Sequence, residues 1–301
     1  MKKILITGGT VFVSKFLTEY FLASGYEVFV LNRNTKEQVL GAKLIQADRH
    51  SLTDELRPHN FDAVIDVNAY TKEDVQTLTD ALGSFGDYIL ISSSAVYPET
   101  LPQPFREDYP TGHNRIWGDY GTGKCEAEAY LTKHCPQAYI LRPPYLYGPM
   151  QNLYREPFVF ECALEGRPVV LPKKDIRLQF FHVRDLCRFI EILLHTHPRQ
   201  RIFNVGNPLS ITAKEWVTLC YEAAGRSPSF VLADPSHSVR SYFCFHDYSY
   251  ELDVSAQSQL LKKTTPLSEG LKEYFDYFLT HKAEFVSKPY KEYIDKHITN
   301  H

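Results

Sequence analysis

A tyrosine and a lysine four residues apart form the pair in this sequence that is best suited to acid–base chemistry. Of the 20 tyrosines, only Tyr120 has a lysine at this spacing, Lys124. A tyrosine hydroxyl has a pKa near 10, so it is a poor base at neutral pH. An ammonium group one helical turn away would favour the phenolate, and lowering the pKa by about three units corresponds to about 4 kcal/mol. We therefore expect Tyr120 to exchange a proton with a substrate hydroxyl.

Three hydroxyl side chains follow an apolar run upstream of this pair. The run Ile89-Leu90-Ile91 is typical of a strand, and Ser92, Ser93 and Ser94 come directly after it. Side chains at the carboxyl end of such a strand lie where open α/β sheets bind ligands. Ser93 would therefore hydrogen-bond the substrate oxygen. The alternative interpretation is a surface helix with one solvated lysine beside a serine-rich loop.

A glycine-containing turn, Thr7-Gly8-Gly9-Thr10-Val11-Phe12-Val13-Ser14, separates the first predicted strand from a helix. Amides at a helix N-terminus favour a pyrophosphate. We therefore expect a dinucleotide to contact Gly8, Gly9, Thr10, Val11, Phe12 and Val13. In the GxxGxxG spacing of such turns, Val11 replaces the glycine that lets the backbone approach phosphate, and Ser14 replaces the last glycine. The alternative is an ordinary strand–helix turn that binds no dinucleotide.

Residues after the second and third predicted strands bear on which dinucleotide binds. Asn32 and Arg33 stand where a carboxylate normally holds the ribose 2′-hydroxyl of NAD. With no carboxylate to repel a 2′-phosphate and with Arg33 available to pair with it, NADP is slightly favoured over NAD. Asp48 is expected to accept a hydrogen bond from the adenine amino group. The alternatives are a solvated loop arginine and a loop-capping aspartate.

The elements that must position these residues alternate between short β-branched runs and longer helical patterns. The predicted strands of the first half are Lys3–Thr7, Glu27–Asn32, Lys43–Ala47, Ala63–Val67, Tyr88–Ser92 and Ala138–Leu141. This alternation predicts an α/β fold with a Rossmann-type, doubly wound parallel sheet.

The regular alternation ends near residue 150. We therefore divide the chain into a dinucleotide-binding domain, residues 1–150, and a smaller C-terminal α+β substrate lobe, residues 151–301, with residues of about 178–205 returning to the first domain. Helices are predicted near Phe158–Leu164, Asp185–His195 and Thr212–Ala224, and a strand at Arg201–Val205.

Composition narrows the class of function. The net charge of −3 is the small difference between 33 basic and 36 acidic residues, which favours a small-molecule substrate and no nucleic-acid partner. No apolar stretch approaches the roughly 18 residues needed to span a membrane, so we expect a cytoplasmic protein. Six scattered cysteines form no CxxC pair, and we expect reduced thiols and no metal site.

Four segments carry a resemblance to a known family. They are Thr7-Gly8-Gly9-Thr10, Ser93-Ser94-Ala95-Val96-Tyr97, Tyr120 with Lys124, and Leu141-Arg142-Pro143-Pro144-Tyr145-Leu146-Tyr147-Gly148-Pro149. With these, the chain resembles the NAD-dependent epimerase/dehydratase family of extended short-chain dehydrogenases/reductases over approximately residues 1–260. The resemblance implies that Ser93, Tyr120 and Lys124 are catalytic, that Lys124 binds the nicotinamide ribose and that Pro143 lines the nicotinamide pocket. It also implies a homodimer through the helix that carries Tyr120.

The chain departs from the family pattern at several positions. Many sugar-nucleotide members have asparagine in place of Tyr145 and arginine in place of Leu178, and both residues would touch the nucleotide diphosphate; Arg177 is the candidate to replace the latter. Val11 and Asn68, both counted as cofactor contacts, are further departures shared with atypical members, some of which have lost catalysis and bind RNA. The candidate substrate contacts are Ser94, Trp117, Tyr145, Arg177 and Arg240. For Trp117 a packing role and for Arg240 a surface position are the alternatives.

The leading hypothesis is an NAD(P)-dependent epimerase, dehydratase or reductase that acts on a hydroxyl or carbonyl of a sugar-like or nucleotide-sugar substrate. Ser94 and Ala95 stand where dehydratases of this family tend to carry an acidic residue, which argues against a dehydratase. The alternative is a non-catalytic dinucleotide- or RNA-binding relative. The intact set of Ser93, Tyr120 and Lys124 and the slightly acidic charge argue against it.

Overall fold

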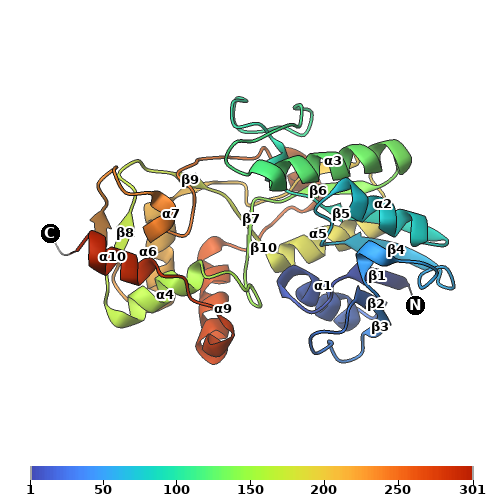
Figure 1. The fold of residues 1–301 in the computed structure, drawn as a ribbon, viewed down its shortest axis with the longest axis horizontal. Coiled ribbons are helices and arrows are strands. Elements are labelled where there is room, and N and C mark those ends of the chain that lie inside the picture. Colours follow the sequence, from blue (N-terminus) through green and yellow to red (C-terminus); the bar gives the residue numbers. More distant parts are fainter. Residues whose placement is uncertain (1, 300–301) are drawn as a thin grey trace.

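A seven-stranded parallel sheet forms the centre of the larger domain (Figure 1). The computed structural model describes residues 2–299. The strand order is β11-β6-β5-β4-β1-β2-β3, so the chain winds outward in both directions from β1 and β4. The strands are β1 (Lys3–Thr7), β2 (Glu27–Asn32), β3 (Lys43–Gln46), β4 (Phe61–Asp66), β5 (Phe85–Ile91), β6 (Tyr139–Arg142) and β11 (Ile202–Asn204). The predicted doubly wound Rossmann-type sheet is thus confirmed.

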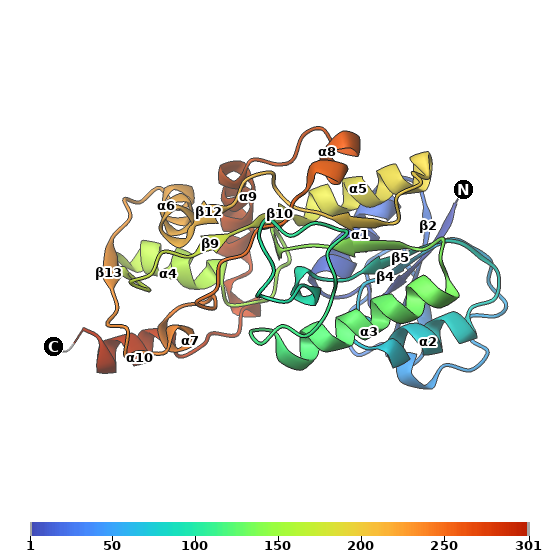
Figure 2. The same cartoon turned by 90° about the horizontal axis from the view of Figure 1, so that it is seen from above.

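Two pairs of helices cover the two faces of this sheet (Figure 2). On one face lie α1 (Phe12–Ala23) and α5 (Val183–Thr196), whose apolar side chains share a core with β1, β4 and β5. On the other lie α2 (Lys72–Ala81) and α3 (Gly118–His134). Because the inner strands are buried on both sides, their side chains are almost continuously apolar, as in other parallel sheets.

The remaining elements form a smaller lobe at the carboxyl side of the sheet, where the chain ends (Figure 1). They include α4 (Glu156–Glu165), β8 (Val169–Leu171), α6 (Ala213–Ala223), β13 (Phe230–Leu232), α7 (Val239–Tyr242), α9 (Leu267–Thr280) and α10 (Tyr290–His297). Their core is strongly aromatic and centres on Phe158, Trp216 and Tyr274. Although it lies beyond residue 150, α5 packs on α1, and β11 pairs with β6 at the edge of the main sheet.

Short elements connect the two parts. They are β7 (Tyr145–Tyr147), β9 (Arg177–Leu178), β10 (Phe180–His182), β12 (Ile211–Thr212), α8 (Ser255–Leu260) and the 3-10 helices η1 (Arg49–Ser51), η2 (Ser94–Val96) and η3 (Lys282–Glu284). β10 pairs with β7, which places His182 beside α9, 3.7 Å from Glu273.

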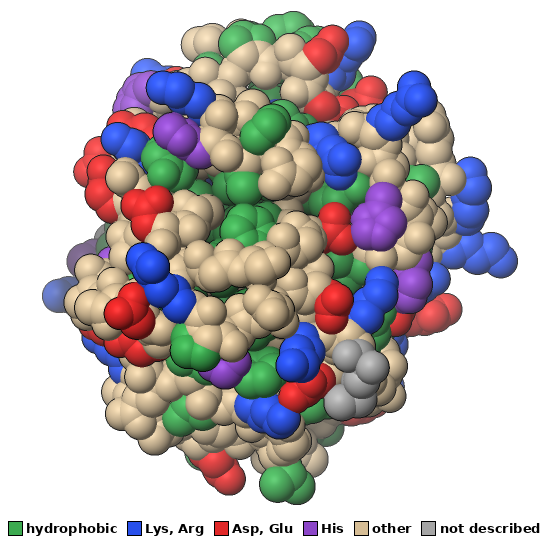
Figure 3. All heavy atoms as spheres, turned by 90° about the vertical axis from the view of Figure 1, so that its right-hand side faces the viewer, with side chains coloured by type: hydrophobic (Ala, Val, Ile, Leu, Met, Phe, Trp, Pro, Cys, Tyr) green, Lys and Arg blue, Asp and Glu red, His purple; other side chains and the backbone are tan. Residues whose placement is uncertain are grey.

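Charges of both signs are interspersed over the outer end of the large domain (Figure 3). Among residues 2–299, no helix is both long and apolar enough to cross a membrane.

Candidate active site

A cleft of about 880 Å³ opens at the carboxyl ends of the parallel strands and is closed from the other side by the small lobe. It collects nearly all of the residues singled out in the sequence. Those that line it are Gly8, Thr10, Val11, Phe12, Val13, Asn32, Arg33, Asp48, Asn68, Ser93, Ser94, Trp117, Tyr120, Lys124, Pro143, Tyr145 and Arg240. Gly9 and Arg177 are the exceptions.

The expected acid–base pair lies in the first turns of α3. The Tyr120 side chain is exposed in the cleft, whereas Lys124 is only 2% exposed and its ammonium donates a hydrogen bond of 2.8 Å to the carbonyl of Ile91. The ammonium lies 5.9 Å from the centre of the Tyr120 ring and 5.1 Å from that of Tyr70. A lysine in this position has one donor committed to the strand end and others left for a ligand.

Two pKa shifts describe the electrostatics of the pair. Burial lowers the pKa of Lys124 to about 8, although Asp66 and Glu128 act in the opposite direction. Desolvation raises the pKa of Tyr120 above its ordinary value, while the hydroxyl of Ser93 opposes the shift. In the protein alone the pKa of Tyr120 therefore shifts in the direction opposite to the one expected from the lysine spacing, because desolvation is the largest contribution.

Two glycines let α3 approach the sheet edge closely enough to deliver this pair. A Cβ on Gly121 would lie 2.6 Å from the carbonyl oxygen of Ala95, and one on Gly123 would lie 2.4 Å from that of Tyr70. Real Cβ atoms do not come this close to backbone. In the sequence Tyr120-Gly121-Thr122-Gly123-Lys124, the two candidate reactive side chains thus flank glycines that let the helix backbone pack closely against the neighbouring loops.

An ion pair fixes the same helix one turn later. The guanidinium of Arg142, at the end of β6, holds Glu128 at 2.6 Å and donates to the hydroxyl of Tyr97 at 2.7 Å. Ser92 donates to the same carboxylate at 2.5 Å. Tyr120, Lys124 and Glu128 therefore occupy one face of α3, since residues four apart share a face of a helix.

The β1–α1 turn has the features that a dinucleotide diphosphate requires. Gly8 adopts a φ of +91°, and no side chain caps the start of α1, whose first turn carries no acidic residue. The first four amides of a helix lack intrahelical acceptors, so they are available to an anion in the cleft. The residues present therefore fit the expected group.

Val11 adopts the extended conformation at φ −137°, as its β-branched side chain demands. The left-handed conformation instead falls on Phe12, at φ +35°. For a bulky residue this is strained by about 1–3 kcal/mol. Gly9 does not line the cleft, because its φ of +90° turns it toward β2, where a Cβ would lie 2.4 Å from Val30.

At the end of β2, the side chain of Asn32 forms hydrogen bonds within the protein. Its amide donates to the carbonyl of Gly8 at 2.6 Å and its oxygen accepts from the backbone of Asn34 at 2.8 Å. Arg33 is largely exposed and lies 3.9 Å from the carboxylate of Asp48. Asp48 also caps η1 by accepting from the backbone of His50.

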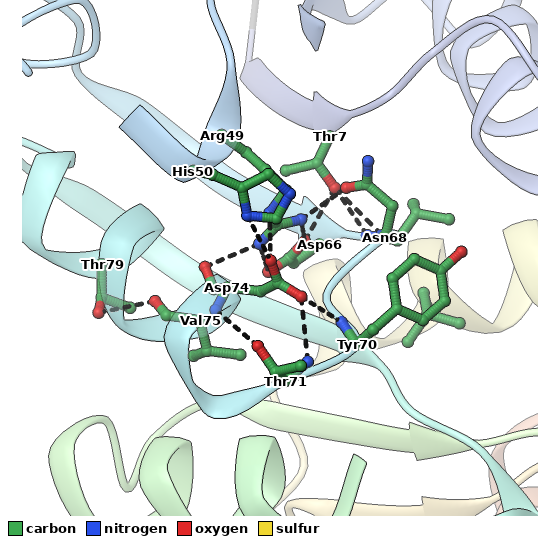
Figure 4. A network of polar contacts seen from close by, with 12 residues as sticks. Thr7, Arg49, His50, Asp66, Asn68, Tyr70, Thr71, Asp74, Val75 and Thr79 are labelled. Carbon is green, nitrogen blue, oxygen red and sulfur yellow. Dashed lines mark hydrogen bonds and ion pairs between the residues drawn. The ribbon is translucent and has the colours of Figure 1, made fainter. Parts of the chain in front are cut away.

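A buried charge network that the sequence analysis did not predict lies behind the turn (Figure 4). Arg49 donates to Asp66 at 2.9 Å and to the backbone carbonyl of Asp74 at 2.8 Å. Burial alone would raise the pKa of Asp66, but Arg49 and the hydroxyls of Tyr88 and Thr7 hold it below its usual value. The available signal for Arg49 was a basic residue three positions after the end of β3, next to Asp48.

The opposite end of the cleft is aromatic and cationic. Trp117 packs edge-on against Tyr145 and His246, with ring centres 6.3 and 5.2 Å apart. Arg155 is neutralised by Glu156 at 3.0 Å, whereas Arg240 donates to the backbone carbonyls of Phe243 and Cys244. Both arginines line the cleft together with Tyr145.

The structure does not bring Arg177 to this site. Its side chain pairs with Glu251 at 2.9 Å and with Ser210 in a separate surface pocket. Neighbouring residues of a strand point to opposite faces, so Arg177 cannot occupy the place of Leu178, which is buried.

Comparison with known proteins agrees with this architecture. The model of the NAD dependent epimerase/dehydratase family matches residues 4–206, well over half of the chain. The chain belongs to this family. The resemblance drawn from the sequence and the expected class of enzyme are thereby confirmed.

Several curated proteins and solved structures are similar over most of the chain. A chloroplast stem-loop binding protein of 41 kDa from Arabidopsis thaliana is 27% identical over 91% of this chain and 79% of its own length. A UDP-glucose 4-epimerase from Corynebacterium glutamicum is 23% identical over 74% of this chain and 80% of its own. Among structures, dTDP-glucose 4,6-dehydratase from Bacillus anthracis, in complex with NAD, matches with a TM-score of 0.73 at 19% identity over 95% of this chain and 99% of that one. UDP-glucose 4-epimerase from Thermotoga maritima, with UDP-glucose, gives 0.74 at 20% identity over 92% and 99%. The structural matches establish the shared fold.

Proposed function

We propose that this family member binds a nicotinamide dinucleotide and oxidises or reduces a hydroxyl-bearing carbon of a sugar-like or nucleotide-sugar substrate. The observation that carries the proposal is the convergence of Ser93, Tyr120 and Lys124 in one cleft with the glycine turn. The named epimerases and dehydratases that it resembles act on nucleotide sugars, which supports this class of substrate.

The proposed roles follow from position. Ser93 orients the substrate oxygen, Tyr120 takes up or returns its proton, and Lys124 donates to the nicotinamide ribose. When bound, the nicotinamide supplies the hydride acceptor and a positive charge that stabilises the phenolate. Because desolvation raises the pKa of Tyr120 in the protein alone, this tyrosine would become a base chiefly when the cofactor is in place.

Replacement of Tyr120 by phenylalanine tests the function directly. Tyr120→Phe keeps the ring but removes the proton carrier, so we expect turnover to fall by roughly two to four orders of magnitude. The measurement is the reduction of bound cofactor by candidate sugars and nucleotide sugars, with Tyr130→Phe, on the same helix but outside the cleft, as the matched control. Near-normal turnover in Tyr120→Phe, with its fold intact, would contradict the mechanism.

A modest preference for NADP is part of the proposal. Arg33 is 69% exposed, and its 3.9 Å contact with Asp48 is a weak solvated pair that leaves it free to meet a 2′-phosphate. NADP should raise the thermal midpoint more than NAD at equal concentration, because a ligand stabilises the fold that it binds. Arg33→Gln should abolish the difference; a larger shift with NAD in the unchanged protein would refute the preference.

The cytoplasmic location and the homodimer through α3 stay predictions. The side of α3 that faces outward carries Asp119, Glu126 and Lys133, so the proposed interface would be polar. A solution mass at twice that of the chain would support the dimer.

A further inference from the structure

Asn68, a departure from the family pattern, lies at the point where the glycine turn, the buried charge network and the cleft meet. It follows β4 and lines the cleft. Its backbone amide and that of Val67 donate to the hydroxyl of Thr7, at 3.4 and 2.9 Å, which ties this segment to the end of β1. The Asn68 side chain is therefore held beside the β1–α1 turn.

Chemistry decides which way the Asn68 amide points. Arg49 donates from Nη1 to its side-chain oxygen at 2.6 Å. A guanidinium has no acceptor, so the group that faces Arg49 must be the oxygen, and Nδ2 must face the other way. Figure 4 shows the oxygen toward Arg49 and the nitrogen directed away from the network. Nδ2 lies 4.0 Å from the position that a Cβ on Gly8 would take.

Arg49 holds this orientation firmly. Its guanidinium is bound to Asp66, to the backbone of Asp74 and, at 3.4 Å, to the Asp74 carboxylate, and all three side chains are at least nine-tenths buried. Removing Arg49 would leave the buried carboxylates of Asp66 and Asp74 without their cation. The oxygen of Asn68 therefore has a fixed donor, and its amide nitrogen is a preoriented donor on the cleft side.

The neighbouring turn lacks one of its usual phosphate contacts. At the central position of the glycine spacing, Val11 adds a side chain that lines the cleft and keeps an extended backbone. Glycine there would let the backbone approach phosphate more closely. A ligand diphosphate would thus be held farther from the backbone donors than in a turn with all three glycines.

We propose that the Nδ2 group of Asn68, held by Arg49, donates a hydrogen bond to the diphosphate–ribose unit of the bound dinucleotide and so replaces the contact that Val11 removes. The inference rests on the proposed function, since it gives Asn68, already an expected cofactor contact, a defined donor group and target in the same site. It makes Asn68 a binding residue and Arg49 the positioning residue behind it.

The test compares Asn68→Asp with Asn68→Ala by calorimetric titration with ADP-ribose and NAD. Asn68→Asp preserves the shape and gives Arg49 an even stronger acceptor, so the fold should persist, but it offers no donor and adds a negative charge beside the diphosphate. Asn68→Ala removes the donor without adding charge. We expect a loss of affinity of about tenfold for Asn68→Ala and about a hundredfold for Asn68→Asp, with equal losses for the two ligands.

Asn152→Asp is the matched control, because it places the same charge at the exposed rim of the other end of the cleft. It should leave the affinity for ADP-ribose within about twofold. A folded Asn68→Asp protein that binds ADP-ribose as tightly as the unchanged protein would overturn the inference, since a purely structural asparagine tolerates this change. Loss of NAD affinity without loss of ADP-ribose affinity would also overturn it, by moving the contact to the nicotinamide. If the unchanged protein bound neither ligand, the proposed function itself would fall, and the inference with it.

Discussion

The buried ammonium of Lys124 lowers the stability of the fold. Its ammonium is buried, and desolvation lowers its pKa to about 8 from an ordinary value of 10.5. At neutral pH the folded protein must hold a proton that the unfolded chain binds more tightly. By linkage, this costs on the order of 3 kcal/mol, before any contact with a ligand.

Lys124→Met should therefore stabilise the protein while impairing it. We expect the free energy of unfolding at pH 7 to rise by about 1–3 kcal/mol, and cofactor-dependent turnover to fall sharply. Between pH 8 and 10.5 the unfolded chain binds more protons at this lysine than the folded protein does. The free energy of unfolding of the unchanged protein therefore rises with pH relative to that of the variant, and the difference between the two proteins shrinks. Urea unfolding at pH 7 and pH 10 measures the difference; a gap that widens with pH would contradict the assignment.

At the scale of the element, the position of α3 decides whether the pair can act. The helix is held by the Glu128–Arg142 ion pair and by the backbone clearance at Gly121 and Gly123. An alanine would favour the isolated helix by about 1 kcal/mol. In this protein the tertiary contact outweighs that gain, because the added Cβ would meet a backbone carbonyl.

Gly123→Ala should push the start of α3 away from the loop at Tyr70. We expect a loss of stability of about 1–3 kcal/mol and a fall in turnover of about tenfold or more, because a displaced acid–base pair loses alignment. Gly112→Ala is the matched control, since its Cβ would meet Pro98 at an ordinary 3.5 Å. Turnover in Gly123→Ala equal to that of the control would mean that α3 accommodates the added Cβ without displacing Tyr120 and Lys124. Steady-state kinetics and thermal unfolding provide the two readouts.

At the scale of the whole molecule, the distribution of charge separates an enzyme from an RNA-binding relative. One similar protein is named for binding stem-loops, but this chain has a net charge of −3, and charges of both signs alternate on the face drawn in Figure 3. Affinity for RNA rests largely on the neutralisation of phosphates.

We therefore expect a stem-loop RNA to bind with a Kd weaker than about 10 μM at roughly 150 mM salt. An electrophoretic mobility shift measures it, and bovine serum albumin at the same concentration serves as an acidic control protein. Nanomolar binding that weakens steeply with salt would reverse the conclusion and favour the RNA-binding alternative.

The sequence by itself determined the fold class, and it singled out the proposed acid–base pair. The strands are short apolar runs and the helices follow apolar periodicity, and both patterns arise from local geometry that a sequence records directly. The spacing of Tyr120 and Lys124 places both on one helix face for the same reason, and the β-branched Val11 is found with the negative φ that its side chain requires.

Only the tertiary structure decided how residues distant in sequence combine. The Arg49 network joins residues at the ends of β3 and β4, and the orientation of Asn68 depends on that network. Arg177 pairs with Glu251 on another segment and therefore lies outside the cleft. Likewise, the pKa of Tyr120 is raised by desolvation in the folded protein, whereas the lysine spacing alone predicted a lowered pKa. Desolvation and long-range pairing depend on which surfaces the folded chain brings together, and periodicity along the chain does not record them.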